Sequence, residues 1–125
     1  MARILIIDDE DLVLDTLHQI LEMAGHEVME AVDGEQGLER YRNDPTDLVI
    51  TDIIMPRADG IETIMTLKRE YPNVKIIAMS GGGRINQENL LGWAASLGVQ
   101  HIVHKPFDSK KIVEIVRQAV VENMS

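Results

Sequence analysis

Apolar runs of strand length alternate with amphipathic stretches of helix length, and this alternation restricts the fold more than any other feature of the chain. Because helices join successive parallel strands, the pattern predicts an α/β fold with one parallel sheet covered on both faces. The expected strands are 4–7, 26–31, 48–50, 74–79 and 101–104, and the expected helices are 10–24, 35–42, 61–70, 87–97 and 108–122. Residues 1–125 are therefore expected to form a single domain.

Polarity within the strands predicts their positions in the sheet. Runs 4–7 and 48–50 are wholly apolar, which is typical of central strands buried on both faces. Runs 26–31 and 101–104 also contain polar residues and favour the two edges. In the third expected helix, Ile61, Ile64 and Met65 share one face and are expected to enter the core.

Charge and composition exclude several classes of partner. The formal net charge is -9 and no cluster of lysine and arginine occurs, so direct binding to nucleic acid or to an anionic membrane is not expected. No apolar run approaches the roughly 20 residues of a membrane span, and there is no cysteine to form a disulfide. We expect a cytoplasmic protein whose partners are proteins and cations.

Side chains that can react or bind a metal ion follow four of the expected strands. Asp8 and Asp9 follow the first strand, Asp52 the third, Ser80 the fourth and Lys105 the fifth. Since the carboxyl ends of parallel strands meet at one edge of the sheet, these side chains are expected to converge. Taken singly, each has an ordinary explanation: adjacent acids favour a helix N-terminus, a serine can cap a helix, and a lysine is usually solvated.

Together these side chains describe a pocket for a phosphoryl group. Carboxylates about 4 Å apart repel by roughly 1 to 4 kcal/mol in solvated to partly solvated sites, so the acids require a cation. Oxygen ligands that form an incomplete cage suit Mg²⁺. Lys105 and Ser80 would then contact phosphoryl oxygens. Asp52 stands alone among apolar neighbours and is the candidate acceptor, whereas the adjacent Asp8 and Asp9 suit metal binding.

The same motifs resemble the receiver domain of two-component response regulators over nearly the whole chain. The resemblance rests on ILIIDDE at 4–10, DIIMP at 52–56, DG at 59–60, MSG at 79–81 and KPF at 105–107. It implies a doubly wound, flavodoxin-like sheet of order 2-1-3-4-5 flanked by five helices. It also implies that a histidine kinase or phosphotransfer protein phosphorylates Asp52, with Mg²⁺ held by Asp9, Asp52 and the backbone carbonyl of Ile54, and with Asp8 acting through water.

The resemblance further implies a signalling phosphoacceptor whose output surface comprises the fourth helix, fifth strand and fifth helix. Two departures stand out. Ile102 occupies a position that is usually Tyr or Phe in the family, and Gly81 to Gly83 form an unusually glycine-rich loop. Switching is therefore expected to rely on Ser80 and this loop, or on His101 or His104.

Two other functions remain open from the residues. A phosphohydrolase of the haloacid-dehalogenase type would also use an aspartyl-phosphate, but it would place the nucleophile after the first strand with a second acid two residues later. Here Asp52 follows the third strand, and Ile54 stands at that offset. A receiver-like scaffold that binds partners without phosphorylation is the other alternative, and the complete set of acids, serine and lysine argues against it.

Overall fold

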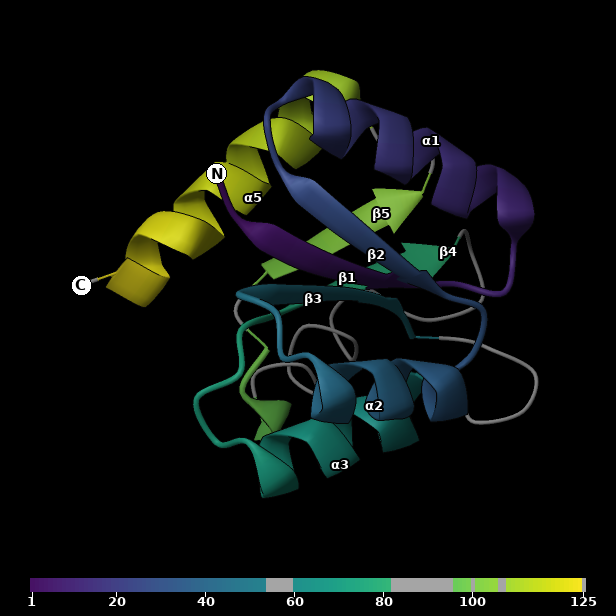
Figure 1. The fold of residues 1–125 in the computed structure, drawn as a ribbon, viewed down its shortest axis with the longest axis vertical. Coiled ribbons are helices and arrows are strands. Elements are labelled where there is room, and N and C mark those ends of the chain that lie inside the picture. Colours follow the sequence, from purple (N-terminus) through teal and green to yellow (C-terminus); the bar gives the residue numbers. More distant parts are fainter. Residues whose placement is uncertain (54–59, 82–95, 100, 106–107, 125) are drawn as a thin grey trace.

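The computed structural model describes residues 1–53, 60–81, 96–99, 101–105 and 108–124, and its centre is a five-stranded parallel sheet of order β2-β1-β3-β4-β5 (Figure 1). The strands are β1 (Arg3–Ile7), β2 (Glu27–Ala31), β3 (Leu48–Asp52), β4 (Ile76–Gly81) and β5 (His101–Lys105). The helices are α1 (Asp11–Met23), α2 (Gly34–Asn43), α3 (Gly60–Glu70) and α5 (Ser109–Met124). The fold class and strand order predicted from the sequence are confirmed.

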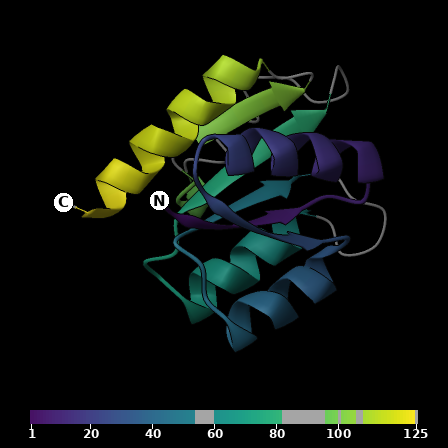
Figure 2. The same ribbon diagram turned by 45° about the horizontal axis from the view of Figure 1, so that its top comes forward.

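The helices cover both faces of the sheet. Helices α1 and α5 lie on one face, and α2 and α3 lie on the other (Figure 2). Side chains alternate along a strand, so Ile4 and Ile6 pack into the cluster beneath α1 and α5, whereas Leu5 and Ile7 pack toward α2 and α3. All residues of β3 are buried, which confirms its central position, while β2 and β5 occupy the edges.

One predicted core residue is wrong. Met65 is 50% exposed, whereas Ile64 is buried as predicted and Ile61 packs against the core from a partly buried position. Gly60, Thr63 and Leu67 complete the buried face of α3. Met65 lies at the margin of this helical stripe, where apolar periodicity alone does not distinguish core from solvent. Gly60 packs tightly on the backbone of Asp52 and Ile53, which holds the start of α3 against the sheet.

The expected helix 87–97 falls outside the described residues except for 96 and 97, which are helical. The glycine-rich loop beyond Gly81 and the carbonyl of Ile54 also lie outside them. Among the described residues, no helix is both long and apolar enough to cross a membrane.

Two histidines near the first two strands should affect stability with opposite dependence on pH. Nδ1 of His18 lies 2.6 Å from Glu30 Oε2, and its Nε2 lies 3.2 Å from Glu22 Oε2. Burial would lower the pKa of His18, but these two carboxylates outweigh it and raise the pKa above its ordinary 6.5. The stabilisation is therefore complete below the unfolded-state pKa and is lost as the pH rises through the folded-state pKa.

We expect His18→Gln to lower the free energy of unfolding by about 0.5 kcal/mol near pH 6 and by much less near pH 8.5, as measured by urea unfolding. His26 provides a control of opposite sign. Its Nδ1 accepts a hydrogen bond from the Ala2 N–H, and burial, followed by the nearby N-terminal amine, lowers its pKa. The loss in His26→Gln should therefore be larger at the higher pH. Equal losses at both pH values would contradict the ionic role of His18.

Candidate functional site

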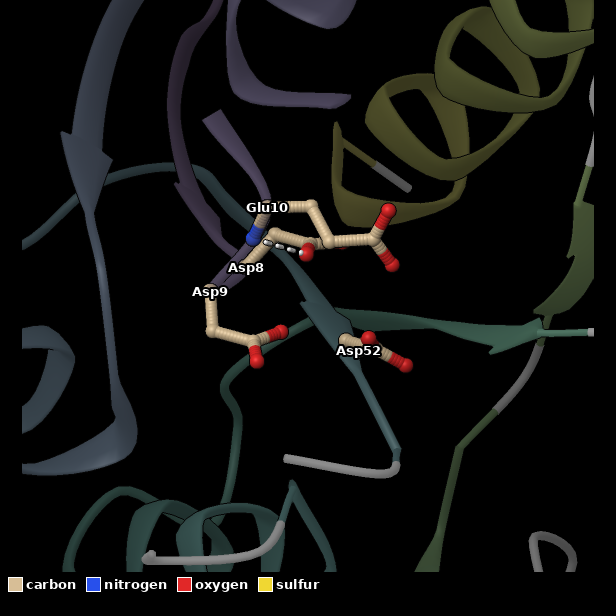
Figure 3. Close-up of side chains that lie close together, drawn as sticks. All are labelled: Asp8, Asp9, Glu10 and Asp52. Carbon is tan, nitrogen blue, oxygen red and sulfur yellow. Dashed lines mark hydrogen bonds between the residues drawn. The ribbon is translucent and has the colours of Figure 1, made fainter. Parts of the chain in front are cut away.

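Four acidic side chains gather where β1 and β3 end (Figure 3). Asp8, Asp9 and Glu10 connect β1 to α1, and Asp52 is the last residue of β3. One ligand oxygen from each residue lies within 4.8 Å of those from the other three. Asp8 and Asp52 are buried, whereas Asp9 and Glu10 are exposed. The cluster therefore has a buried floor and a solvent-facing rim.

Lys105, the last residue of β5, reaches across β4 to this cluster. Its Nζ donates hydrogen bonds to Asp8 Oδ2 at 2.7 Å and Asp52 Oδ2 at 3.0 Å, and it lies 3.6 Å from Glu10 Oε1. The lysine side chain is only 11% exposed, and those of Asp8 and Asp52 are 0% and 5% exposed. One ammonium group thus joins the ends of β1, β3 and β5 in a nearly buried ion-pair network.

Burial also shifts the pKa values of this network. It raises the pKa of the Asp8 carboxyl, and the hydrogen bonds from Lys105 and from the Glu10 N–H offset part of that rise. Burial would lower the pKa of Lys105, but hydrogen bonds to Asp8 and Asp52 outweigh it and raise the pKa. Lys105 therefore stays charged at neutral pH, while the Asp8 carboxylate still lacks full compensation for its lost hydration.

Backbone hydrogen bonds beyond the strands fix the positions of the acids. The Asp8 N–H donates to the Ala31 carbonyl at 3.1 Å, and the Ile53 N–H donates to the Met79 carbonyl at 3.0 Å. Each bond continues a strand ladder by one residue. The Gly60 N–H donates to the Ile53 carbonyl at 2.9 Å, so the start of α3 is attached to the backbone beside Asp52.

Ser80 makes a side-chain contact that the sequence did not predict. It pairs in register with His104 across β4 and β5, and its Oγ lies 2.6 Å from His104 Nδ1. The serine is buried, at 8% exposure, and the histidine is exposed. The sequence suggested that Ser80 would face a phosphoryl group and left the role of His104 open. This contact depends on strand register, which apolar runs do not specify to a single residue.

The structure thus brings Asp8, Asp9, Asp52 and Lys105 together, and it adds Glu10, which sequence reasoning did not select. The run of three acids at 8–10 was the available signal for Glu10. The carboxylate oxygens fit a hard divalent cation, which prefers oxygen ligands and tolerates an open coordination shell. Because two of these acids already bind Lys105, a cation would share them with the ammonium group.

The sheet order defines a flavodoxin-like domain, and the acid cluster lies at the switch point between β1 and β3, at the carboxyl edge of the sheet. Residues 4–117 match the family model of the response regulator receiver domain. The chain therefore belongs to the response regulator receiver family.

Individual relatives agree with this assignment. Over 115 residues the chain is 37% identical to chemotaxis protein CheY of Treponema pallidum, covering 90% of this chain and 78% of that protein. It is 34% identical over 117 residues to CheY of Thermotoga maritima, covering 93% and 95%. The crystal structure of a response regulator receiver domain protein from Clostridium thermocellum superposes with a TM-score of 0.90 at 28% identity, covering 99% and 98%.

Proposed function

We propose that the chain accepts a phosphoryl group on Asp52 within a two-component or phosphorelay system. The donor is a phosphohistidine of a histidine kinase or phosphotransfer protein. An Asp52 carboxylate oxygen attacks phosphorus, the phosphorus–nitrogen bond breaks, and the histidine nitrogen leaves and takes up a proton. The observation that carries the proposal is the contact between Lys105 Nζ and Asp52 Oδ2 in a nearly buried acidic pocket.

The surrounding residues have separate roles in this proposal. The Lys105 ammonium balances charge on the transferred group, since it already compensates Asp52 at 3.0 Å. Asp9, Asp52 and the backbone carbonyl of Ile54 would hold Mg²⁺ directly, and Asp8 would bind it through water. When bound, Mg²⁺ would neutralise the acids and the phosphoryl oxygens. The all-oxygen donor set of the acid cluster supports this assignment.

The protein is proposed to act as a signalling phosphoacceptor and not as a turnover enzyme. Residues 1–125 would form one receiver domain, located in the cytoplasm, that binds neither nucleic acid nor membrane directly. Phosphorylation would alter binding of a downstream protein at a face that comprises the fourth helix expected from the sequence (87–97), β5 and α5. A coupling of about 1 to 3 kcal/mol would change partner affinity by roughly 5- to 150-fold.

A small phosphodonor tests this function without the natural kinase. Incubation with Mg²⁺ and phosphoramidate is expected to add the mass of one phosphoryl group, measured on the intact protein. Asp52→Asn and addition of a chelator should each abolish the gain. Asp11→Asn provides a matched control, since Asp11 is exposed at the start of α1 and lies outside the cluster.

The alternatives give different results. A phosphohydrolase would release inorganic phosphate continuously and show little stable mass gain, whereas a scaffold that is not phosphorylated would show neither. Either result would overturn the proposal, as would an undiminished mass gain in Asp52→Asn.

A further inference from the structure

The hydrogen bond between Ser80 and His104 lies beside the acidic pocket but joins none of its acids. Ser80 follows Met79, the register partner of Asp52, so the serine is on the strand adjacent to the proposed phosphoacceptor. His104 precedes Lys105, whose side chain contacts Asp52. Neighbouring residues of β5 therefore contact Asp52 itself and the serine on the adjacent strand β4.

The donors and acceptors available to Ser80 and His104 indicate which side chain donates the hydrogen bond. The Ser80 hydroxyl has one proton, and the oxygen of this buried serine lies 2.6 Å from His104 Nδ1. A neutral imidazole with its proton on Nε2 accepts the Ser80 proton at Nδ1 and donates to water on its exposed side. The opposite tautomer would leave the buried hydroxyl proton without this acceptor, which is unfavourable.

A phosphoryl group on Asp52 would compete with the imidazole for that proton. Its oxygens are anionic, and hydrogen bonds to ionised acceptors are roughly twice as strong as neutral ones. The hydroxyl cannot donate fully to both acceptors at once. With the imidazole proton on Nε2, Ser80 can therefore donate to a phosphoryl oxygen only by withdrawing its proton from His104 Nδ1.

We propose that His104 is a positioning residue that holds the Ser80 hydroxyl in the unphosphorylated protein and releases it when Asp52 is phosphorylated. The inference deepens the function proposed above and depends on it. Release also leaves the exposed imidazole without its serine partner at the edge strand β5. The event in the pocket thereby changes the hydrogen-bonding surface that β5 presents to solvent or to a partner protein.

Phosphorylation kinetics test this role. With phosphoramidate and Mg²⁺, His104→Leu is expected to raise the rate constant for mass gain about 2- to 12-fold, the factor that corresponds to one ordinary net hydrogen bond. His104→Asn, whose side-chain oxygen can replace Nδ1 as an acceptor, should restore the wild-type rate to within about 2-fold. His101→Leu is the matched control, because His101 pairs in register with Ile77 and not with Ser80.

A second set of variants, built on Ser80→Ala, distinguishes a positioning role of His104 from a general structural effect of its substitution. In Ser80→Ala the hydroxyl is absent, so adding His104→Leu should change the rate constant by less than about 1.5-fold. An equal change in both backgrounds would overturn the proposal. So would an unchanged or lower rate in the single His104→Leu variant.

Nitrogen NMR of the imidazole provides a measurement that does not depend on rate. Nδ1 of His104 should show the shift of a hydrogen-bonded acceptor before phosphorylation and should change on phosphorylation in the wild type, but not in Ser80→Ala. If the intact mass shows full phosphorylation and the wild-type Nδ1 signal is unchanged, only the His104 proposal fails. If wild-type protein gains no phosphoryl group, the proposed function fails and the His104 proposal fails with it.

Discussion

Lys105→Met is expected to lower the free energy of unfolding by about 3 kcal/mol at neutral pH in metal-free buffer, because it removes one partner from a nearly buried ion-pair network. The substitution keeps a long apolar side chain but leaves the Asp8 and Asp52 carboxylates without the ammonium that now lies 2.7 and 3.0 Å away. Both acids are buried, so water cannot fully replace the lost contacts. Urea unfolding measures the effect directly.

The dependence of this loss on pH and Mg²⁺ identifies its cause. Burial raises the pKa of Asp8, so the folded state binds this proton more tightly than the unfolded state does. Stability associated with Asp8 therefore increases as the pH falls through the folded-state pKa, and the deficit of Lys105→Met should shrink on acidification. Mg²⁺ should also reduce the deficit, since it supplies positive charge to the same carboxylates.

Lys111→Met is the matched control for this prediction. Lys111 lies on an exposed part of α5, so its substitution should change stability by no more than about 0.5 kcal/mol. A Lys105→Met protein as stable as the Lys111→Met protein in metal-free buffer would show that the network does not stabilise the fold.

Gly60→Ala should have a comparably large effect for a steric reason. A Cβ at residue 60 would overlap the backbone carbonyl oxygen of Asp52 and approach Ile53 Cα to 2.6 Å. Backbone cannot rotate aside as a side chain can, so we expect a loss of about 3 kcal/mol, at the upper end of typical overpacking costs. Because displacement of Asp52 would disturb the reacting geometry, phosphorylation should also slow by about 10- to 100-fold.

Gly37→Ala separates the steric effect from the change in helix propensity. Gly37 lies in α2, and a Cβ there would meet the side chain of Ile7, with Cγ1 at 2.9 Å. A rotamer adjustment of Ile7 should limit the net loss to about 1 kcal/mol, with phosphorylation unchanged. Urea unfolding and the phosphoramidate assay compare the two variants. Equal stability losses would contradict the special role of the Asp52 backbone contact.

The layers of the fold could be predicted from the sequence, because continuous apolar runs indicate buried strands, whereas apolar residues at helical spacing indicate helices. In α3 the sequence correctly placed Ile61 and Ile64 against the core but not Met65, which is exposed. The close approach of Gly60 to the backbone of Asp52 and Ile53 also could not be predicted. Local periodicity contains no information about that contact.

The candidate site likewise has features that could be predicted from the sequence and one contact that could not. Asp8, Asp52 and Lys105 could be grouped from the sequence because parallel strands bring their carboxyl ends to one edge. The bond between Ser80 and His104 depends on the register of β4 against β5, where a shift of one residue would turn the serine to the other face. Side-chain partners at a sheet edge are therefore less predictable than the edge itself.

Locating the phosphoryl group within the protein tests the central claim most directly. Borohydride reduction of the phosphorylated protein converts an aspartyl-phosphate into homoserine, which peptide mass spectrometry can assign to one residue. The proposed chemistry predicts homoserine at position 52, formed only after treatment with phosphodonor and Mg²⁺. Homoserine at position 8 or 9, or an intact Asp52 in protein that carries a phosphoryl group, would contradict it.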